Sequence, residues 1–197
     1  MFRGARITAY NSPVPFAKKR AKPAELDLEG LMNYAAFVLR SRAQSSGELR
    51  QKLKRRAAQA SDVDEVIRRL KDNGYLSDKH FAESFAGWRR DNQGLGKARV
   101  VRDLLARRVA PELAKKAADT AYSQVDEIKM IEQFLARKYR GKDLGVMLSE
   151  AKHLASAYRR LRTAGFSSGN SIRVLKRFAA EAERLEEMEE GAEPSSA

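Results

Sequence analysis

The side chains that could do chemistry in this sequence are mostly positive charges, and they recur in clusters. The first cluster is Arg50, Lys52, Lys54, Arg55 and Arg56. The later clusters are Arg99, Arg102, Arg107 and Arg108, then Arg159, Arg160 and Arg162, and finally Arg173, Lys176 and Arg177. Side chains of this kind bind phosphate and give salt-sensitive, sequence-independent contacts to nucleic acid. A single run of charges is usually a solvated surface. Whether these clusters are solvated or bind phosphate therefore depends on how the helices that carry them are arranged.

Residues suited to catalysis are sparse. The two histidines, His80 and His153, stand apart and are expected to be surface polar groups. The sequence contains no cysteine, which excludes disulfides, thiolate nucleophiles and cysteine-bound metals. Gly94-Leu95-Gly96 would need a third glycine where Arg99 stands to match a dinucleotide-binding loop. We therefore expect no enzyme activity, no cofactor and no metal site.

The charge is distributed unevenly over the 197 residues. The chain carries 39 Lys and Arg against 26 Asp and Glu, a formal net charge of +13. Residues 1–24 carry +6 and three prolines, which predicts a flexible basic arm, and residues 181–197 carry −6, which predicts an acidic extension. The two ends cancel, so the whole excess lies in residues 25–180 and favours a polyanionic partner. We hypothesise that the acidic extension competes with nucleic acid for this basic body.

Composition and apolar patterning indicate a helical protein. Hydrophobic residues make up 43% of the chain, enough to build a core, and no apolar run reaches the ~18 residues that span a membrane. With no secretory signal either, we expect a cytoplasmic protein that does not enter membranes. Apolar residues recur at three and four positions, and Ser45-x-x-Glu48 has capping-box spacing. The predicted helices are 26–42, 46–57, 62–73, 78–92, 97–108, 111–122, 125–140, 150–164 and 169–188.

An internal repeat relates these nine helices. A shift of 51 residues, and then of 57, superposes three apolar sets: Leu49, Leu53, Val66, Ile67 and Leu70; Val100, Leu104, Ala117, Ala118 and Ala121; Ala157, Leu161, Val174, Leu175 and Phe178. Phe37, Trp88 and Tyr139 also lie 51 apart, which predicts equivalent core positions on the first helices. The six additional residues of the second shift are assigned to a longer loop within residues 140–148.

The repeat predicts an all-α fold of tandem three-helix units. We expect an arm at 1–24, repeats at 25–76, 77–124 and 125–180, and an extension at 181–197. A three-helix unit is too small for a core of its own, so the units must stack into an elongated curved rod, here expected to be a monomer. The basic clusters then recur on corresponding helices and form a discontinuous positive stripe.

Four ordered blocks of this body resemble a known family. The blocks are Leu39-x-x-Arg42-x-x-Ser45-x-x-Glu48-Leu49-x-x-Lys52-Leu53, Leu70-x-x-x-Gly74-Tyr75-Leu76-Ser77-Asp78-x-x-Phe81-Ala82, Gly94-x-Gly96-x-x-Arg99-Val100-x-x-x-Leu104 and Leu161-x-x-x-Gly165-Phe166-Ser167. In this order and spacing they are similar to blocks of the RecX proteins, bacterial regulators of the RecA recombinase. The sequence departs from the family where Ser77 replaces an aspartate, Lys97 a proline, Arg108 a glycine and Ala164 an arginine.

The resemblance implies tandem three-helix repeats and a concrete function. RecX proteins bind RecA–DNA filaments along the helical groove, inhibit ATPase and strand-exchange activity, limit filament extension, and so restrain recombination, DNA repair and the SOS response. The implied partners are the RecA filament, the single-stranded DNA within it and free DNA. The residues expected at this interface are Arg50, Lys52, Lys54, Arg55, Arg56, Arg99, Arg102, Arg107, Arg159, Arg160, Arg162 and Arg173.

Two other functions remain open at this stage. The same charge and short helices fit a nucleoid-type or helix-turn-helix protein that binds duplex DNA without RecA. A metal-dependent nuclease is a weaker alternative that would use Asp62, Asp64 and Glu65. Those three acids also suit the positive end of a helix, where they would simply stabilise it.

Overall fold

The computed structural model describes residues 25–179, so the predicted arm at 1–24 and extension at 181–197 lie outside the described residues. Within residues 25–179 the chain forms ten α-helices and no strand beyond one isolated β-bridge, between Leu26 and Ala57. The helices are α1 (Leu28–Ser41), α2 (Ser46–Lys54), α3 (Ala60–Asp72), α4 (Asp78–Gln93), α5 (Lys97–Ala106), α6 (Pro111–Tyr122), α7 (Glu127–Lys138), α8 (Leu144–Leu148), α9 (Ala151–Ala164) and α10 (Ser168–Leu175).

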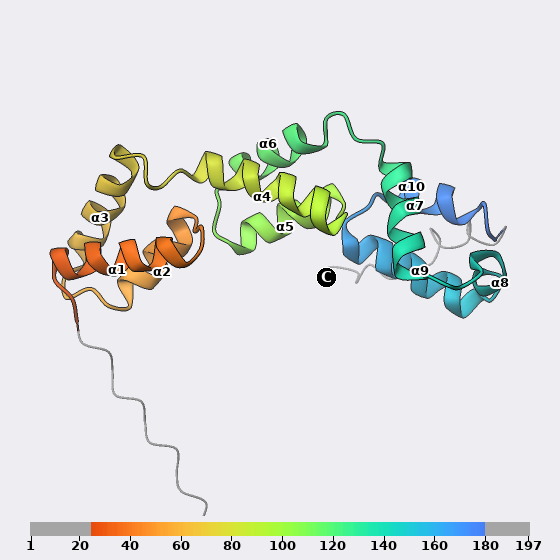
Figure 1. Cartoon of the computed structure of the whole chain (residues 1–197), viewed down its shortest axis with the longest axis horizontal. Helices are drawn as coiled ribbons and strands as arrows, with labels where there is room; N and C mark the ends of the chain where they lie inside the picture. The colour runs from red at the N-terminus through yellow and green to blue at the C-terminus, as the bar shows by residue number, and fades with distance from the viewer. Residues whose placement is uncertain (1–24, 180–197) are drawn as a thin grey trace, which may run out of the picture.

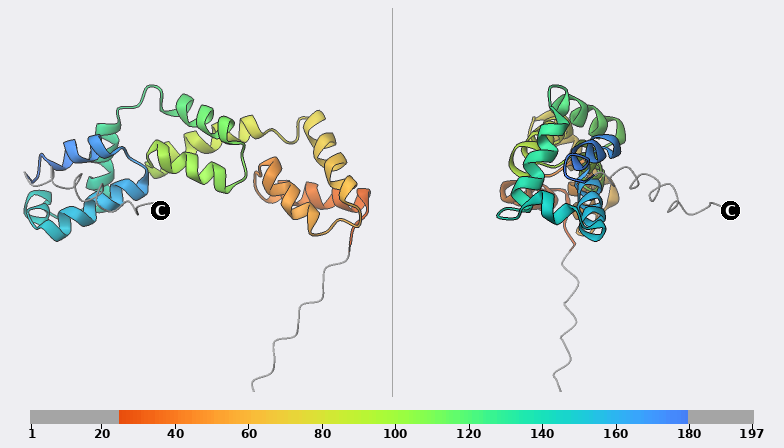
Figure 2. Two further views of the ribbon diagram at one scale, coloured as in Figure 1. Left: turned by 180° about the vertical axis from the view of Figure 1, so that it is seen from behind. Right: turned by 90° about the vertical axis from the view of Figure 1, so that its right-hand side faces the viewer.

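The helices gather into three groups that follow one another along an elongated, curved array (Figure 1). We call them the first unit (α1–α3), the second unit (α4–α6) and the third unit (α7–α10). Each surrounds its own cluster of buried side chains, within residues 31–76, 81–117 and 131–179, so the expectation that a three-helix unit is too small for a core of its own is wrong. The view along the long axis shows the narrow cross-section of this array (Figure 2).

The internal repeat is confirmed by burial. Of the fifteen apolar positions matched by the two shifts, thirteen are buried, and only Ala121 and Phe178 are partly exposed. Helices α2, α5 and α9 therefore correspond to one another, as do α3, α6 and α10, at spacings of 51 and then 57 residues. The tandem three-helix architecture predicted from the sequence is the one observed.

The first helices correspond differently from the prediction. Phe37 is 71% exposed and Trp88 is 51% exposed, so the prediction that these rings lie in the core is wrong. In the third unit the buried residues of α7 are Ile131 and Leu135, which follow Ala82 and Ala86 of α4 by 49 positions. Tyr139 is therefore not the counterpart of Trp88.

Two further boundaries differ from the prediction. The expected loop at 140–148 contains the five-residue helix α8, whose Leu148 is fully buried in the core of the third unit. Asp143 caps α8 by accepting from the Val146 N–H at 3.1 Å. So short a helix is stabilised mainly by packing its apolar face on the core of the third unit. The last helix, predicted to run to 188, ends at Leu175.

The corresponding helices α2, α5 and α9 are stacked end to end along one side of the array (Figure 1). One carbonyl near the end of each helix accepts a hydrogen bond at the junction. The Ala164 carbonyl accepts from the Gly96 N–H at 2.9 Å, and the Arg107 carbonyl accepts from the Ser45 hydroxyl. At the free end of α2, the Arg56 carbonyl accepts from the Leu26 N–H at 2.6 Å, so residues from the start of the first unit close the column.

Candidate nucleic-acid interface

The structure divides the predicted basic residues into two classes, and the first class is already bonded. Arg50 pairs with Asp64, and Arg107 lies 3.4 Å from Glu48 across the first junction. Arg99 donates to Asp103 at 2.9 Å and, like Arg102, to the Thr163 carbonyl. Arg162 donates to the Phe166 carbonyl at 2.7 Å, and the Arg56 guanidinium lies over the Tyr34 ring. These side chains hold helices and units together.

The second class consists of cations that form no side-chain hydrogen bond or ion pair within residues 25–179. All but the partly exposed Lys52 are exposed. They are Lys52, Lys54, Arg55, Arg159, Arg160 and Arg173. Because nothing in the described part of the chain neutralises them, they are the better candidates for phosphate contact.

Along the column of α2, α5 and α9, the unpaired cations of this class lie at the two ends rather than in an even stripe. Lys52 and Lys54 belong to α2 and Arg55 caps its C-terminus, whereas Arg159 and Arg160 belong to α9. Lys52 and Arg160 occupy corresponding positions on these helices, and the same position of α5 carries the acid Asp103. Asp103 bonds Arg99 and lies 3.1 Å from Arg89, so the middle of the column is internally neutralised.

A shallow cationic hollow lies where α5, α7 and α9 meet, with a volume of about 390 Å³. Four basic side chains surround it: Arg99, Lys138, Arg159 and Arg160. Its apolar lining comes from Leu95, Phe134 and Ala164. The sequence pattern identified three of these four cations but missed Lys138 and Phe134, because only the fold brings α7 against α9.

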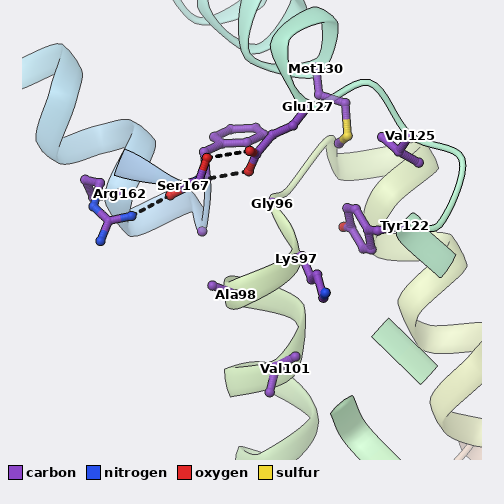
Figure 3. A pocket seen from close by; sticks show the side chains of 12 residues that line it. Gly96, Lys97, Ala98, Val101, Tyr122, Val125, Glu127, Met130, Arg162 and Ser167 are labelled. Carbon is purple, nitrogen blue, oxygen red and sulfur yellow. Dashed lines mark hydrogen bonds between the residues drawn. The ribbon is translucent and has the colours of Figure 1, made fainter. Parts of the chain in front are cut away.

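A second hollow, of about 550 Å³, lies between the second and third units (Figure 3). Val101, Tyr122, Val125 and Met130 make its walls largely apolar. Burial raises the pKa of Tyr122 to about 12, so its hydroxyl stays protonated and donates to the Leu95 carbonyl at 2.5 Å. This hollow was not predicted, since its walls come from segments far apart in the sequence.

The charged groups at the edge of this apolar hollow are already bonded. Glu127 accepts from the Ser167 N–H at 2.9 Å and from the Ser167 hydroxyl at 2.5 Å (Figure 3). Asn170 donates to the same carboxylate at 2.6 Å. Partial burial opposes ionisation of Glu127, but these hydrogen bonds outweigh it, and the net pKa of Glu127 lies below its usual value. The carboxylate therefore connects α7 to the start of α10 and is not available as a general base.

Two of the three acids considered for a nuclease are engaged elsewhere. Hydrogen bonds from Arg68 and Arg69 lower the pKa of Glu65 to about 2, and Asp64 pairs with Arg50. Within residues 25–179 no three His, Cys, Asp or Glu side chains come together as a metal site. None of the ten helices is both long and apolar enough to cross a membrane.

Comparisons with known proteins agree with one another. A family model described as "RecX, second three-helix domain" matches residues 77–117, within the second unit. The chain is 31% identical over 119 residues to the regulatory protein RecX of Deinococcus radiodurans, an alignment covering 60% of this chain and 56% of that protein. It is 29% identical over 160 residues to the regulatory protein RecX of Amycolatopsis mediterranei, covering 78% of this chain and 88% of that protein.

Solved structures show the same fold. The crystal structure of RecX from Lactobacillus salivarius superposes with a TM-score of 0.59 at 19% identity, covering 77% of this chain and 96% of that one. A second crystal structure, of a regulatory protein RecX, superposes with a TM-score of 0.55 at 16% identity, covering 75% of this chain and 72% of that one. The sequence blocks, the matched second unit and the shared arrangement of helices lead to one conclusion: the chain belongs to the RecX family of regulatory proteins.

Proposed function

We propose that this protein is a non-enzymatic cytoplasmic regulator that binds RecA–DNA filaments in their helical groove. There it inhibits RecA ATPase, strand exchange and filament extension, and thereby restrains recombination, DNA repair and the SOS response. The expected partners are RecA, the single-stranded DNA of the filament and, more weakly, free DNA. The proposed active form is a monomer built of repeats at 25–76, 77–124 and 125–180.

The observation that carries this proposal is the placement of unpaired cations at both ends of an elongated array of three units. Arg55 at the C-terminus of α2 lies in the first unit, and Arg159 and Arg160 on α9 lie in the third unit of the same curved column. A long periodic partner can engage both groups at once, and linked weak contacts raise the overall affinity without any new contact. A filament of repeating protomers on DNA is such a partner.

The central arginines support the same proposal in another way. Arg99, Arg102 and Arg107 hold the junctions between units, and so they fix how far apart the two cationic groups lie. The proposed interface therefore has two contact regions and a rigid spacer, rather than twelve equivalent contacts.

A nucleoid-type or helix-turn-helix protein remains the second candidate, because the same exposed cations would bind duplex DNA without RecA. The discriminating measurement is the ATPase rate of RecA on single-stranded DNA as this protein is added. We expect inhibition at near-stoichiometric amounts, and much tighter binding to the filament than to bare duplex. Full ATPase activity at equal concentrations of the two proteins would refute the RecA proposal.

Charge reversal tests the interface within the same assay. We expect the double variant Arg159→Glu, Arg160→Glu to weaken filament binding by at least tenfold and to flatten its salt dependence, because two phosphate contacts are lost. The matched control is the double variant Lys115→Glu, Lys116→Glu, which reverses two exposed cations of α6 outside the proposed interface and should have a smaller effect. Unchanged affinity and salt slope in the double variant would exclude α9 from the interface.

A further inference from the structure

An arginine covers an aromatic ring at the same place in the first two units. The Arg56 guanidinium lies 5.1 Å from the centre of the Tyr34 ring, and that of Arg107 lies 5.0 Å from the centre of the Phe85 ring. Both partners are shifted by 51 residues, the spacing that relates these units. In each case the second helix ends with a cation stacked on an aromatic side chain of the first helix.

The third unit keeps the ring but lacks the arginine. Phe134 follows Phe85 by 49 residues, the spacing that relates the buried positions of α4 and α7. The counterpart of Arg107 is Ala164, whose carbonyl accepts the equivalent junction hydrogen bond. Ala164 also stands where the RecX resemblance leads us to expect arginine. With alanine there, the Phe134 ring lacks the guanidinium that Arg56 and Arg107 supply in the first two units.

The cationic hollow occupies this vacated position, since Phe134 and Ala164 both line it. Its volume of about 390 Å³ is within the range of about 300–1,000 Å³ typical of small-molecule sites. Another arginine, Arg137, lies 5.9 Å from the Phe134 ring centre, but it donates to the Gln93 carbonyl and lines a neighbouring hollow instead. The position is therefore a ring-lined site that lacks the arginine found there in the first two units.

The charge around the hollow decides what it can accept. Lys138, Arg159 and Arg160 form no side-chain hydrogen bond or ion pair within the described residues, and Arg99 completes the rim. The three unpaired cations disfavour the guanidinium of a partner protein, although a guanidinium is what covers the ring in the other units. They favour a ligand that has a flat face for the ring and a negative charge for the rim. A nucleotide with an unpaired base has both features.

We propose that the hollow holds one unpaired base of single-stranded DNA against Phe134, with the adjoining phosphates at Arg159 and Arg160. This inference deepens the proposed function, since it assigns the third unit to the DNA of the filament. Duplex DNA does not fit the site, because its bases are stacked and paired. The base adds a contact that the phosphate interactions alone would not provide.

The test measures DNA binding by the full chain without RecA. Fluorescence anisotropy compares a labelled oligothymidylate with an oligonucleotide of the same length whose central sugars lack bases, so that the phosphate charge is equal. We expect the wild type to prefer the complete oligonucleotide about tenfold, the size of one lost base–aromatic stack. Phe134→Leu and Ala164→Arg should both abolish this preference.

The two variants act in opposite ways on the same site. Phe134→Leu removes the ring and keeps apolar volume against Phe166, whose ring centre lies 5.5 Å from that of Phe134. Ala164→Arg fills the hollow with the guanidinium that Arg107 supplies in the second unit and adds a positive charge. Ala136→Arg is the matched control, because it adds the same charge at an exposed position of α7 about 200° around the helix from Phe134.

The outcomes separate this inference from the proposed function. Loss of base preference in both variants, with preference retained in Ala136→Arg, supports the base site even if RecA activity is unaffected by the protein. Equal wild-type affinity for complete and base-free oligonucleotides overturns it, as does a preference unchanged by both substitutions. Circular dichroism checks that each variant is folded. If Phe134→Leu does not fold, the base preference of Ala164→Arg still tests the base site.

Discussion

Arg108 has a backbone φ of 60°, the left-handed conformation that side chains with a Cβ seldom adopt. It follows the end of α5, and its counterpart after α9 is Gly165, with φ 93°. Glycine adopts this conformation without the steric cost of roughly 1–2 kcal/mol that other residues incur. The Arg108 side chain offsets part of this cost by donating to the Gln51 side chain across the first junction at 3.0 Å.

We expect Arg108→Gly to stabilise the protein by about 0.5–1 kcal/mol, because relief of the strained backbone exceeds the value of one exposed hydrogen bond. Urea denaturation monitored by circular dichroism measures the change in the free energy of unfolding. Gly165→Ala provides the converse, since an added Cβ would lie 2.2 Å from the Arg99 nitrogen in a backbone with positive φ. A destabilised Arg108→Gly variant would show that the Gln51 contact outweighs the backbone strain.

Sequence reasoning succeeds at single residues whose role is set by their neighbours along the chain. The Ser45 and Glu48 capping box is observed as predicted, with the Ser45 hydroxyl accepting from the Glu48 N–H at 3.0 Å. It fails for Trp88, because an amphipathic helix places apolar residues at the edge of its buried face as well as within it. It also cannot separate bonded arginines such as Arg107 from free ones such as Arg159, since their partners lie on other helices.

At the scale of elements, the loops between the helices determine how neighbouring units contact each other. Gly96 and Gly165 mark loop positions in the sequence, and in the structure they meet directly at the second junction. A Cβ on Gly96 would lie 2.3 Å from the Gly165 carbonyl, so the backbones approach too closely for any side chain. The spacing of these glycines was evident in the sequence, but their contact was not, because it depends on how the units stack.

Glu127 connects two elements whose association is sensitive to pH. Its carboxylate accepts from Ser167, the residue that precedes α10, and from Asn170 within that helix. Its pKa in the folded protein lies below the usual 4.5. The unfolded chain therefore binds this proton more tightly, and the resulting stabilisation is present above pH 4.5 and is lost as the pH falls through the lower folded pKa.

We expect Glu127→Gln to destabilise the protein by about 1 kcal/mol at neutral pH, a value reduced from that of buried charged hydrogen bonds because the site is partly exposed. Thermal unfolding at several pH values should show the difference from wild type shrinking in acid below about pH 4. Glu83→Gln removes an exposed carboxylate on α4 that has no side-chain partner within residues 25–179, and it serves as the control. A difference independent of pH would contradict the role of the ionised carboxylate.

At the scale of the molecule, the repeat was predictable because each unit buries apolar residues at the same spacing. Leu49, Val100 and Ala157 are all buried at positions 51 and 57 apart. The third unit departs from this regularity through α8 and the shifted register of α7, which place Phe134 beneath the cationic hollow. The candidate site therefore lies where the repeat is least exact, and this explains why the pattern of the repeat did not reveal it.

The distribution of charge over the whole chain leads to a last prediction. Residues 181–197, outside the described residues, carry −6, and the remainder of the chain carries +19. If this negative charge competes with phosphate for the cations of α2 and α9, deleting the segment relieves the competition. We expect tighter binding to single-stranded DNA and a steeper dependence of affinity on salt, because more counterions are released from the DNA.

A second variant, in which the seven glutamates of this segment are replaced by glutamine, separates the effect of its charge on DNA affinity from the effect of its length. Fluorescence anisotropy over a range of salt concentrations should give the same gain in affinity for the substituted and truncated proteins if charge is responsible. A gain only on truncation would indicate that the segment blocks the surface by its bulk. Unchanged affinity in both variants would mean that the cations on α2 and α9 act without opposition from the acidic end of the chain.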